Sequence, residues 1–229
     1  MTSHDVPTIR QPRQPLGRLT AALAVAGLLA TACSDDTAPV EDYPPPPPGP
    51  AEGLTETPTQ DEPELTHSGR LAPPETAQDA YTYNPELAPA GAELTVEVDR
   101  DGGATAVEFS VDGLLPNRGY AVHAHVDPCG QTGEAAGPHF QHNVDPNATP
   151  DNPSTDPAYA NPDNEIWLDI RTNGEGDGET RTTVPFVFTE RAPGSVVVHE
   201  AEVTATEPGK AGKAGDRLAC LTVPFGTTG

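Results

Sequence analysis

The sequence predicts an all-β protein, an antiparallel β-sandwich or Greek-key barrel of about eight strands, preceded by a disordered linker. Three observations predict this class. Short runs of alternating apolar and polar residues recur from Gly91 onward, Gly and Pro separate these runs, and no stretch shows a helical period. Short strands at this spacing are typical of antiparallel sandwiches and barrels.

Composition limits the chain to one packed domain. Of the 229 residues only 34% are hydrophobic, while Pro (28) and Gly (22) are abundant, so there is too little apolar material for two cores. The formal net charge is −23, and the 12 Lys and Arg residues are scattered. Such a chain would repel a polyanion, which argues against nucleic-acid binding.

Residues 1–33 resemble an export signal. Three arginines precede an apolar run over residues 19–30, which is shorter than the ~20 residues that span a bilayer but suits a signal peptide. The run ends in Leu29-Ala30-Thr31-Ala32-Cys33, which resembles the lipobox of bacterial lipoproteins, where the cysteine is lipidated. We therefore expect a protein of the bacterial cell envelope, lipid-anchored at Cys33 to the outer face of the cell membrane. An ordinary cleaved signal with an incidental cysteine is the alternative.

The cysteine count agrees with this interpretation. An odd number of cysteines in an exported protein needs an explanation, and this chain has three. If Cys33 carries lipid, Cys129 and Cys220 remain as one pair in an oxidising compartment.

Residues 34–89 show no sustained helical or strand period. The segment is acidic and contains five consecutive prolines, Pro44 to Pro48. Proline-rich, like-charged chains are extended, so we predict a disordered linker that holds the domain away from the membrane. Low-complexity filler without a selected length is the alternative.

The predicted domain covers residues 90–229. Alternation over residues 94–98 and again over residues 105–111, with Asp101-Gly102-Gly103 between them, indicates a hairpin. Pro185 lies within a later run and suggests an edge strand, because proline cannot donate to a strand ladder. The further alternating runs cover residues 120–126, 165–171, 182–188, 195–203 and 217–223.

Two histidines are the first sign of chemistry. His123 and His125 are two residues apart in an alternating run, so a strand would project both imidazoles to the same side, where they could bind one metal ion. A lone His-x-His is a weak signal. Four more elements follow in order: Cys129 in the next loop, Gly137-Pro138-His139-Phe140, Val197-Val198-His199, and Gly215-Asp216-Arg217-Leu218-Ala219-Cys220.

These five ordered elements resemble the copper–zinc superoxide dismutase family across residues 91–225. The resemblance implies that superoxide is converted to oxygen and hydrogen peroxide at a copper centre, and that a disulfide joins Cys129 to Cys220. It implies that Arg217 stands beside the copper and pairs with superoxide, and that Lys210 steers the anion. In a chain this acidic, a local positive field has to outweigh the overall negative charge, and Lys213 would contribute to that field together with Lys210 and Arg217. Four imidazoles suit copper, and the implied ligands are His123, His125, His139 and His199.

The zinc half departs from the family pattern. Only His142 and Asp163 remain as further ligands, because Asn147 and either Ala160 or Asn161 stand where the family has histidines. A structural zinc site needs four ligands, so we predict a copper site with zinc absent or weak. His142 could equally be a solvent-exposed loop residue. The loop's Asp and Asn side chains could bind calcium, but without EF-hand spacing a solvated loop is expected. Val203 occupies the position of the family's aspartate that links the two metal sites.

Two functions follow from the resemblance. The first is a superoxide dismutase that acts outside the cytoplasmic membrane. The second is a non-enzymatic copper-binding or storage module on the same fold, since a fold does not determine function. Arg217 favours the enzyme because a copper store needs no anion-guiding cation. The alternative for Arg217 is the commoner role of an arginine, a surface residue at the end of a strand. A metal-free structural sandwich is a third hypothesis, against which the four histidines argue.

Overall fold

The computed structural model describes residues 64–150 and 152–226. The predicted signal peptide, Cys33 and the linker up to residue 63 lie outside this part of the chain. The described residues contain no helix that could span a membrane.

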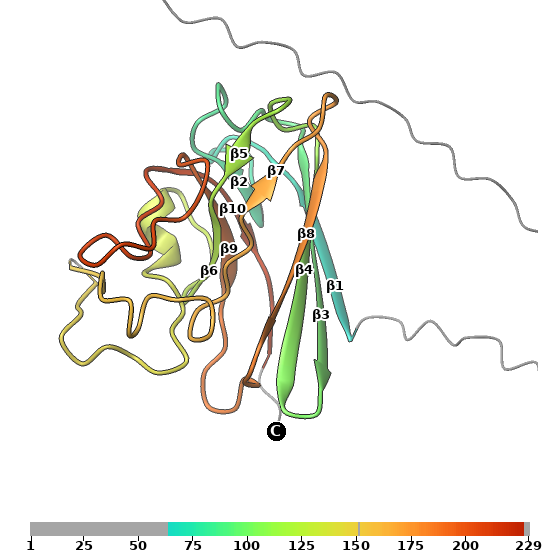
Figure 1. The fold of residues 1–229 in the computed structure, drawn as a ribbon. Coiled ribbons are helices and arrows are strands. Elements are labelled where there is room, and N and C mark those ends of the chain that lie inside the picture. The colour runs from blue at the N-terminus through green and yellow to red at the C-terminus, as the bar shows by residue number, and fades with distance from the viewer. Residues whose placement is uncertain (1–63, 151, 227–229) are drawn as a thin grey trace, which may run out of the picture. The chain divides into compact units, whose positions relative to one another are not determined.

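The fold is all-β, as predicted (Figure 1). One antiparallel sheet has the order β1 (Leu65–Arg70), β3 (Glu93–Asp101), β4 (Ala104–Asp112), β8 (Gly178–Val184). A second has the order β2 (Ala80–Thr82), β10 (Arg217–Thr222), β9 (Ser195–His199), β6 (Val122–His125). A short pair joins β5 (Gly119–Tyr120) to β7 (Ile170–Arg171), and η1 (Gly133–Ala136) is a single 3-10 turn.

The predicted alternation becomes the core. Val96 on β3 and Val107 on β4 are fully buried, while their neighbours along each strand are partly exposed. These side chains form one cluster with residues of the second sheet, such as Val196 and Leu218. Burying one such side chain contributes about 1.5–3 kcal/mol, so the alternation determines which face of each sheet points inward. The predicted turn between β3 and β4 uses Gly102 at φ 56° and Gly103 at φ 88°, a region that favours glycine.

The predicted boundary of the domain at residue 90 is wrong. The strands β1 and β2 lie within residues 34–89, for which the sequence predicts a disordered linker, and the described residues form ten strands rather than about eight. Strand β1 pairs with β3 along its whole length, from Leu65 opposite Val98 to Arg70 opposite Glu93. Its residues are only half-buried or exposed, so the strand is held by ladder hydrogen bonds and needs no apolar alternation.

The predicted runs and the strands differ in their bounds: β8 begins four residues before the run predicted over residues 182–188, and β9 ends four residues before the end of the run predicted over residues 195–203. Strand β8 is an edge strand, as Pro185 suggested, but it ends at Val184 because the next residue cannot donate. In the run over residues 165–171, only Ile170–Arg171 forms a strand, and single bridges hold the rest. Apart from η1, residues 126–150, 152–169 and 200–216 form long loops, which lie beside β6 and β9 (Figure 1).

Candidate metal centre

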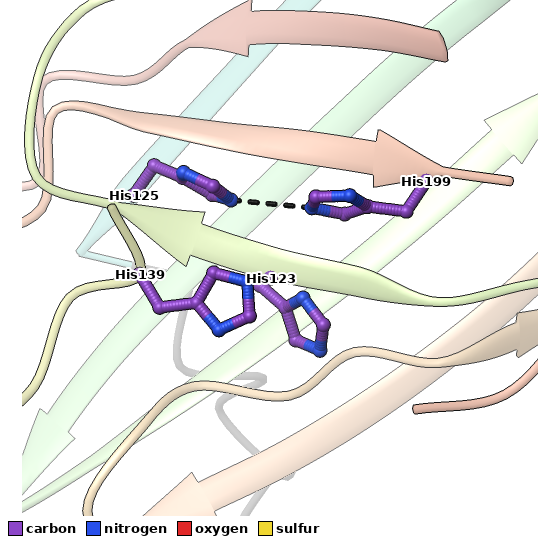
Figure 2. A group of neighbouring side chains, drawn as sticks. All are labelled: His123, His125, His139 and His199. Atoms are coloured by element: carbon purple, nitrogen blue, oxygen red, sulfur yellow. Dashed lines mark hydrogen bonds between the residues drawn. The ribbon is translucent and has the colours of Figure 1, made fainter. Parts of the chain in front are cut away.

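Four histidines from separate parts of the chain form one cluster, as the sequence predicted (Figure 2). Each offers one ring nitrogen, and these four atoms all lie within 4.8 Å of one another. Within the described residues no other group of three or more His, Cys, Asp or Glu side chains is arranged to hold a metal ion. The cluster consists of His123 and His125, which are fully buried, His199, which is 3% exposed, and the half-buried His139.

Strand pairing brings the four rings together. His123 and His125 both lie on β6, which pairs with β9, and the N–H of His199 at the end of β9 donates to the carbonyl of Ala121. On its other edge, β6 receives the segment that carries His139. The N–H of Phe140 donates to the carbonyl of Ala124, with His139 bridged to His125.

The ring nitrogens of His125 and His199 that face away from the cluster contact backbone carbonyls. His125 Nδ1 lies 2.9 Å from the Gly137 oxygen, and His199 Nδ1 lies 3.4 Å from the Gly215 oxygen. A carbonyl only accepts, so both Nδ1 atoms carry the proton and both Nε2 atoms present lone pairs. These Nε2 atoms lie 3.2 Å apart (dashed in Figure 2). Two lone pairs at this distance repel each other unless a cation lies between them.

Protonation of His125 or His199 does not supply this positive charge. Burial, followed by the charges of neighbouring histidines, holds the pKa of His125 well below its usual range. Burial and His139 likewise lower the pKa of His199 to about 3. The rings of His125 and His199 therefore stay neutral at physiological pH, which is the form that binds metals.

His123 gives an independent test of whether a metal fits. Its Nδ1 is buried and has no hydrogen-bond partner among the described residues, while its Nε2 lies 2.7 Å from Thr204 Oγ1. Leaving a buried polar atom unpaired is costly, so such atoms are rare and indicate a missing partner. An unpaired imidazole nitrogen beside three others fits a metal that prefers nitrogen ligands, as copper does.

The sequence did not identify Glu165 as part of the site. Its carboxylate is 2% exposed, and Oε2 lies 2.9 Å from His139 Nδ1. Trp167 Nε1 donates to the same oxygen at 2.8 Å, and Gln141 Nε2 donates to Oε1 at 2.8 Å. The carboxylate accepts the His139 Nδ1 proton, so His139 Nε2 is left to serve as a ligand. A carboxylate on the outer nitrogen is a common means of orienting a metal-binding imidazole.

We therefore expect Glu165→Gln to weaken copper binding about 10- to 100-fold. A glutamine amide has one accepting oxygen, so it cannot satisfy His139, Trp167 and Gln141 together. Competition against a chelator of known copper affinity measures the change. The matched control is Glu108→Gln, which removes a carboxylate paired with Arg181 on the opposite face of β4 from the core. Equal copper affinity in the two variants would contradict this role.

His142 and Asp163 do not join the cluster, which corrects the assignment of these residues as candidate zinc ligands. The His142 ring is exposed and stacks on Phe186, with ring centroids 4.3 Å apart. Asp163 is exposed, in a turn where its N–H donates to Asn161 Oδ1. In the same loop the buried Asp145 accepts a hydrogen bond from the Ser154 hydroxyl, so its carboxylate supports the loop itself.

Arg217 lies at the edge of the cluster. Its backbone pairs with His199, and both residues line a cavity of about 470 Å³. The guanidinium is held by two backbone carbonyls, of Gly133 at 2.6 Å and of Gly137 at 2.7 Å. Lys213 also lines this cavity. Lys210, the predicted steering lysine, is exposed and does not line it.

The implied disulfide is present and joins Cys129 to Cys220 with an S–S distance of 2.00 Å. It attaches the loop after β6 to the middle of β10. This loop includes Gly133 and Gly137, whose carbonyls hold Arg217.

No protein-family model and no curated protein matches the sequence. Among solved structures, the chain is similar to the Cu/Zn superoxide dismutase from Brucella abortus, with 18% sequence identity and a TM-score of 0.44. The match covers 69% of this chain and 99% of that one.

Proposed function

We propose that this chain is a copper-dependent superoxide dismutase that acts outside the cytoplasmic membrane, anchored through lipid at Cys33. The observation that carries the proposal is the meeting of four imidazole nitrogens within 4.8 Å, beside an arginine that lines the same cavity. A copper store would need the nitrogens alone. A fixed guanidinium beside them suits the capture of a small anion.

The histidines and Arg217 have separate roles in this proposal. His123, His125, His139 and His199 would hold the copper. When bound, copper would supply the electron exchange that oxidises one superoxide to oxygen and reduces a second to peroxide. Arg217 attracts the anion, and its position is set by the carbonyls of Gly133 and Gly137. In a chain of net charge −23, the local field of Arg217 and Lys213 has to outweigh the overall repulsion of anions.

Glu165 supports a site for copper without zinc. In a site where one histidine bridges two metals, both of its ring nitrogens are ligands. Here the Nδ1 of His139 instead donates to Glu165, and Glu165 is further held by Gln141 and Trp167. The arrangement leaves His139 one nitrogen for a metal ion.

The test is to load the purified protein with copper alone and with copper plus zinc, and then to measure superoxide removal and metal content. We expect one copper per chain and equal activity in both preparations. Tight copper binding without turnover would favour the copper-binding module. One zinc per chain, together with activity that requires zinc, would contradict the copper-only site.

Arg217→Ala is expected to lower kcat/KM for superoxide about 10- to 100-fold while copper content stays at one per chain, because fixed cations raise anion capture by roughly this range. The rate of the wild-type protein should fall as salt is added, and that of the variant should depend less on salt.

The matched control is Arg181→Ala. Arg181 lies on β8, pairs with Asp99 and Glu108, and does not line the cavity. It removes the same charge from the chain at a distance from the cluster. If both variants lose the same activity, the effect comes from net charge and not from Arg217 as the anion's partner.

A further inference from the structure

The outer nitrogen of His123 contacts a side chain that no family motif indicated. His123 is fully buried, and its Nε2 lies 2.7 Å from Thr204 Oγ1. Thr204 is itself 4% exposed and lies in the loop that follows β9. It is the residue next to Val203, the position at which the sequence suggested that a supporting aspartate was missing.

Asp169 determines where the hydroxyl proton of Thr204 points. Thr204 Oγ1 lies 2.6 Å from Asp169 Oδ1 and donates to it. The same carboxylate accepts the N–H of Thr204 at 2.7 Å and the N–H of Val122 at 3.2 Å. A carboxylate that receives three donors acts as an acceptor only. Since a threonine hydroxyl has one proton, and Asp169 takes it, the hydroxyl can only accept from His123.

The proton of neutral His123 therefore lies on Nε2, and its Nδ1 has the lone pair. That Nδ1 is the buried atom without a hydrogen-bond partner among the described residues. The other three histidines carry the proton on Nδ1 and present Nε2 to the cluster. His123 presents Nδ1, so it needs the proton on Nε2. The contact with Thr204 supplies it.

We propose that Thr204 and Asp169 form a relay of positioning residues that fixes the tautomer and the orientation of His123 for copper. This inference rests on the proposed function, because it assumes copper as the metal. It goes beyond that function in assigning to a threonine, backed by Asp169 from a separate loop, the task of preparing one ligand. The relay also ties the loop after β9 to β6, since Val122 begins that strand.

The test compares Thr204→Val, Thr204→Ser and a matched control. Valine has the shape of threonine but no hydroxyl, whereas serine retains the hydroxyl. The control is Thr172→Val, because Thr172 is also 4% exposed and its hydroxyl donates to the carbonyl of Leu115 at 2.6 Å, away from the cluster. Both valine variants lose a buried hydroxyl, so a general loss of stability should lower Tm in both.

Only the relay predicts a difference at His123. We expect Thr204→Val to weaken copper binding about 10- to 100-fold, as expected for loss of a partner of a metal-binding imidazole, with Thr204→Ser within a few-fold of wild type. In the metal-free protein, long-range ¹H–¹⁵N NMR should show the Nε2–H tautomer in wild type and in Thr204→Ser. In Thr204→Val the Nδ1–H tautomer should become populated. Thr172→Val should change neither quantity.

Unchanged copper affinity in Thr204→Val, or an Nδ1–H tautomer of His123 in the wild-type protein, would overturn the relay. These readouts separate the inference from the proposed function. If the wild-type protein binds copper but does not remove superoxide, the proposed function fails and the affinity series still decides the relay. If the wild-type protein does not bind copper, the proposed function also fails. The tautomer in the metal-free protein then decides whether Thr204 holds His123 as described.

Discussion

The His199→Ala variant is expected to lose copper binding and superoxide removal together. His199 Nε2 lies 3.2 Å from His125 Nε2, and one ion bound between them would need both. Changing a residue that only supports a ligand costs about 10- to 100-fold in affinity, so removing a ligand should cost at least about 100-fold. The loss should appear in chelator competition, in copper stoichiometry after dialysis, and in activity. Near-ultraviolet circular dichroism would show whether the sandwich stays folded.

A second histidine variant provides the control. His142 lies three residues after His139, and the sequence predicts it as a candidate zinc ligand. In the structure its ring is exposed and stacks on Phe186. We expect His142→Ala to keep full copper binding and activity. If His142→Ala removed a metal ion, or if His199→Ala retained wild-type affinity, the cluster would not be the copper site.

The parts of the fold that the sequence predicted are those whose strands bury one face. The strands β3 and β4 alternate visibly because Val96 and Val107 enter the core while their neighbours do not. Strand β1 buries little and is held by its pairing with β3, which leaves no periodic signal in Leu65–Arg70. The linker predicted from the sequence therefore extends too far toward the C-terminus.

The site shows the same division between what the sequence could and could not predict. The four histidines lie in ordered motifs, and the resemblance to a family therefore indicated them. Their partners Glu165, Asp169 and Thr204 depend on how two long loops fold against β6, which short-range patterns do not specify. A signal was nevertheless present, because Ile166 and Leu168 enter the core while Glu165 and Asp169 alternate with them. An alternating run with acidic residues on its second face indicates that this face lies against polar groups.

The disulfide should have the second large effect, on stability. Cys129 and Cys220 are 91 residues apart, and by loop-closure entropy a crosslink of this span stabilises the fold by about 4–5 kcal/mol. Native proteins have a free energy of unfolding of only about 5–15 kcal/mol, so removing the crosslink would cost a large part of the stability. We expect the Cys129→Ala/Cys220→Ala variant to unfold at clearly lower urea concentration than the wild-type protein. Urea titrations with and without dithiothreitol measure this.

Catalysis should fall as well as stability, because the disulfide and Arg217 depend on the same loop. Cys129 begins the segment whose Gly133 and Gly137 carbonyls hold the guanidinium, and Gly137 also accepts from His125. With the crosslink removed, Arg217 loses its fixed position even in molecules that remain folded. We therefore expect kcat/KM to fall under conditions where circular dichroism is unchanged. Dithiothreitol should reproduce the loss of stability in the wild-type protein and change nothing further in the double variant, whereas activity is compared between the two proteins without reductant, because a dithiol binds and reduces copper. A wild-type protein that reductant does not destabilise, together with an unchanged kcat/KM in the double variant, would show that the loop is held by other contacts, such as Tyr83 Oη donating to the carbonyl of Gly130.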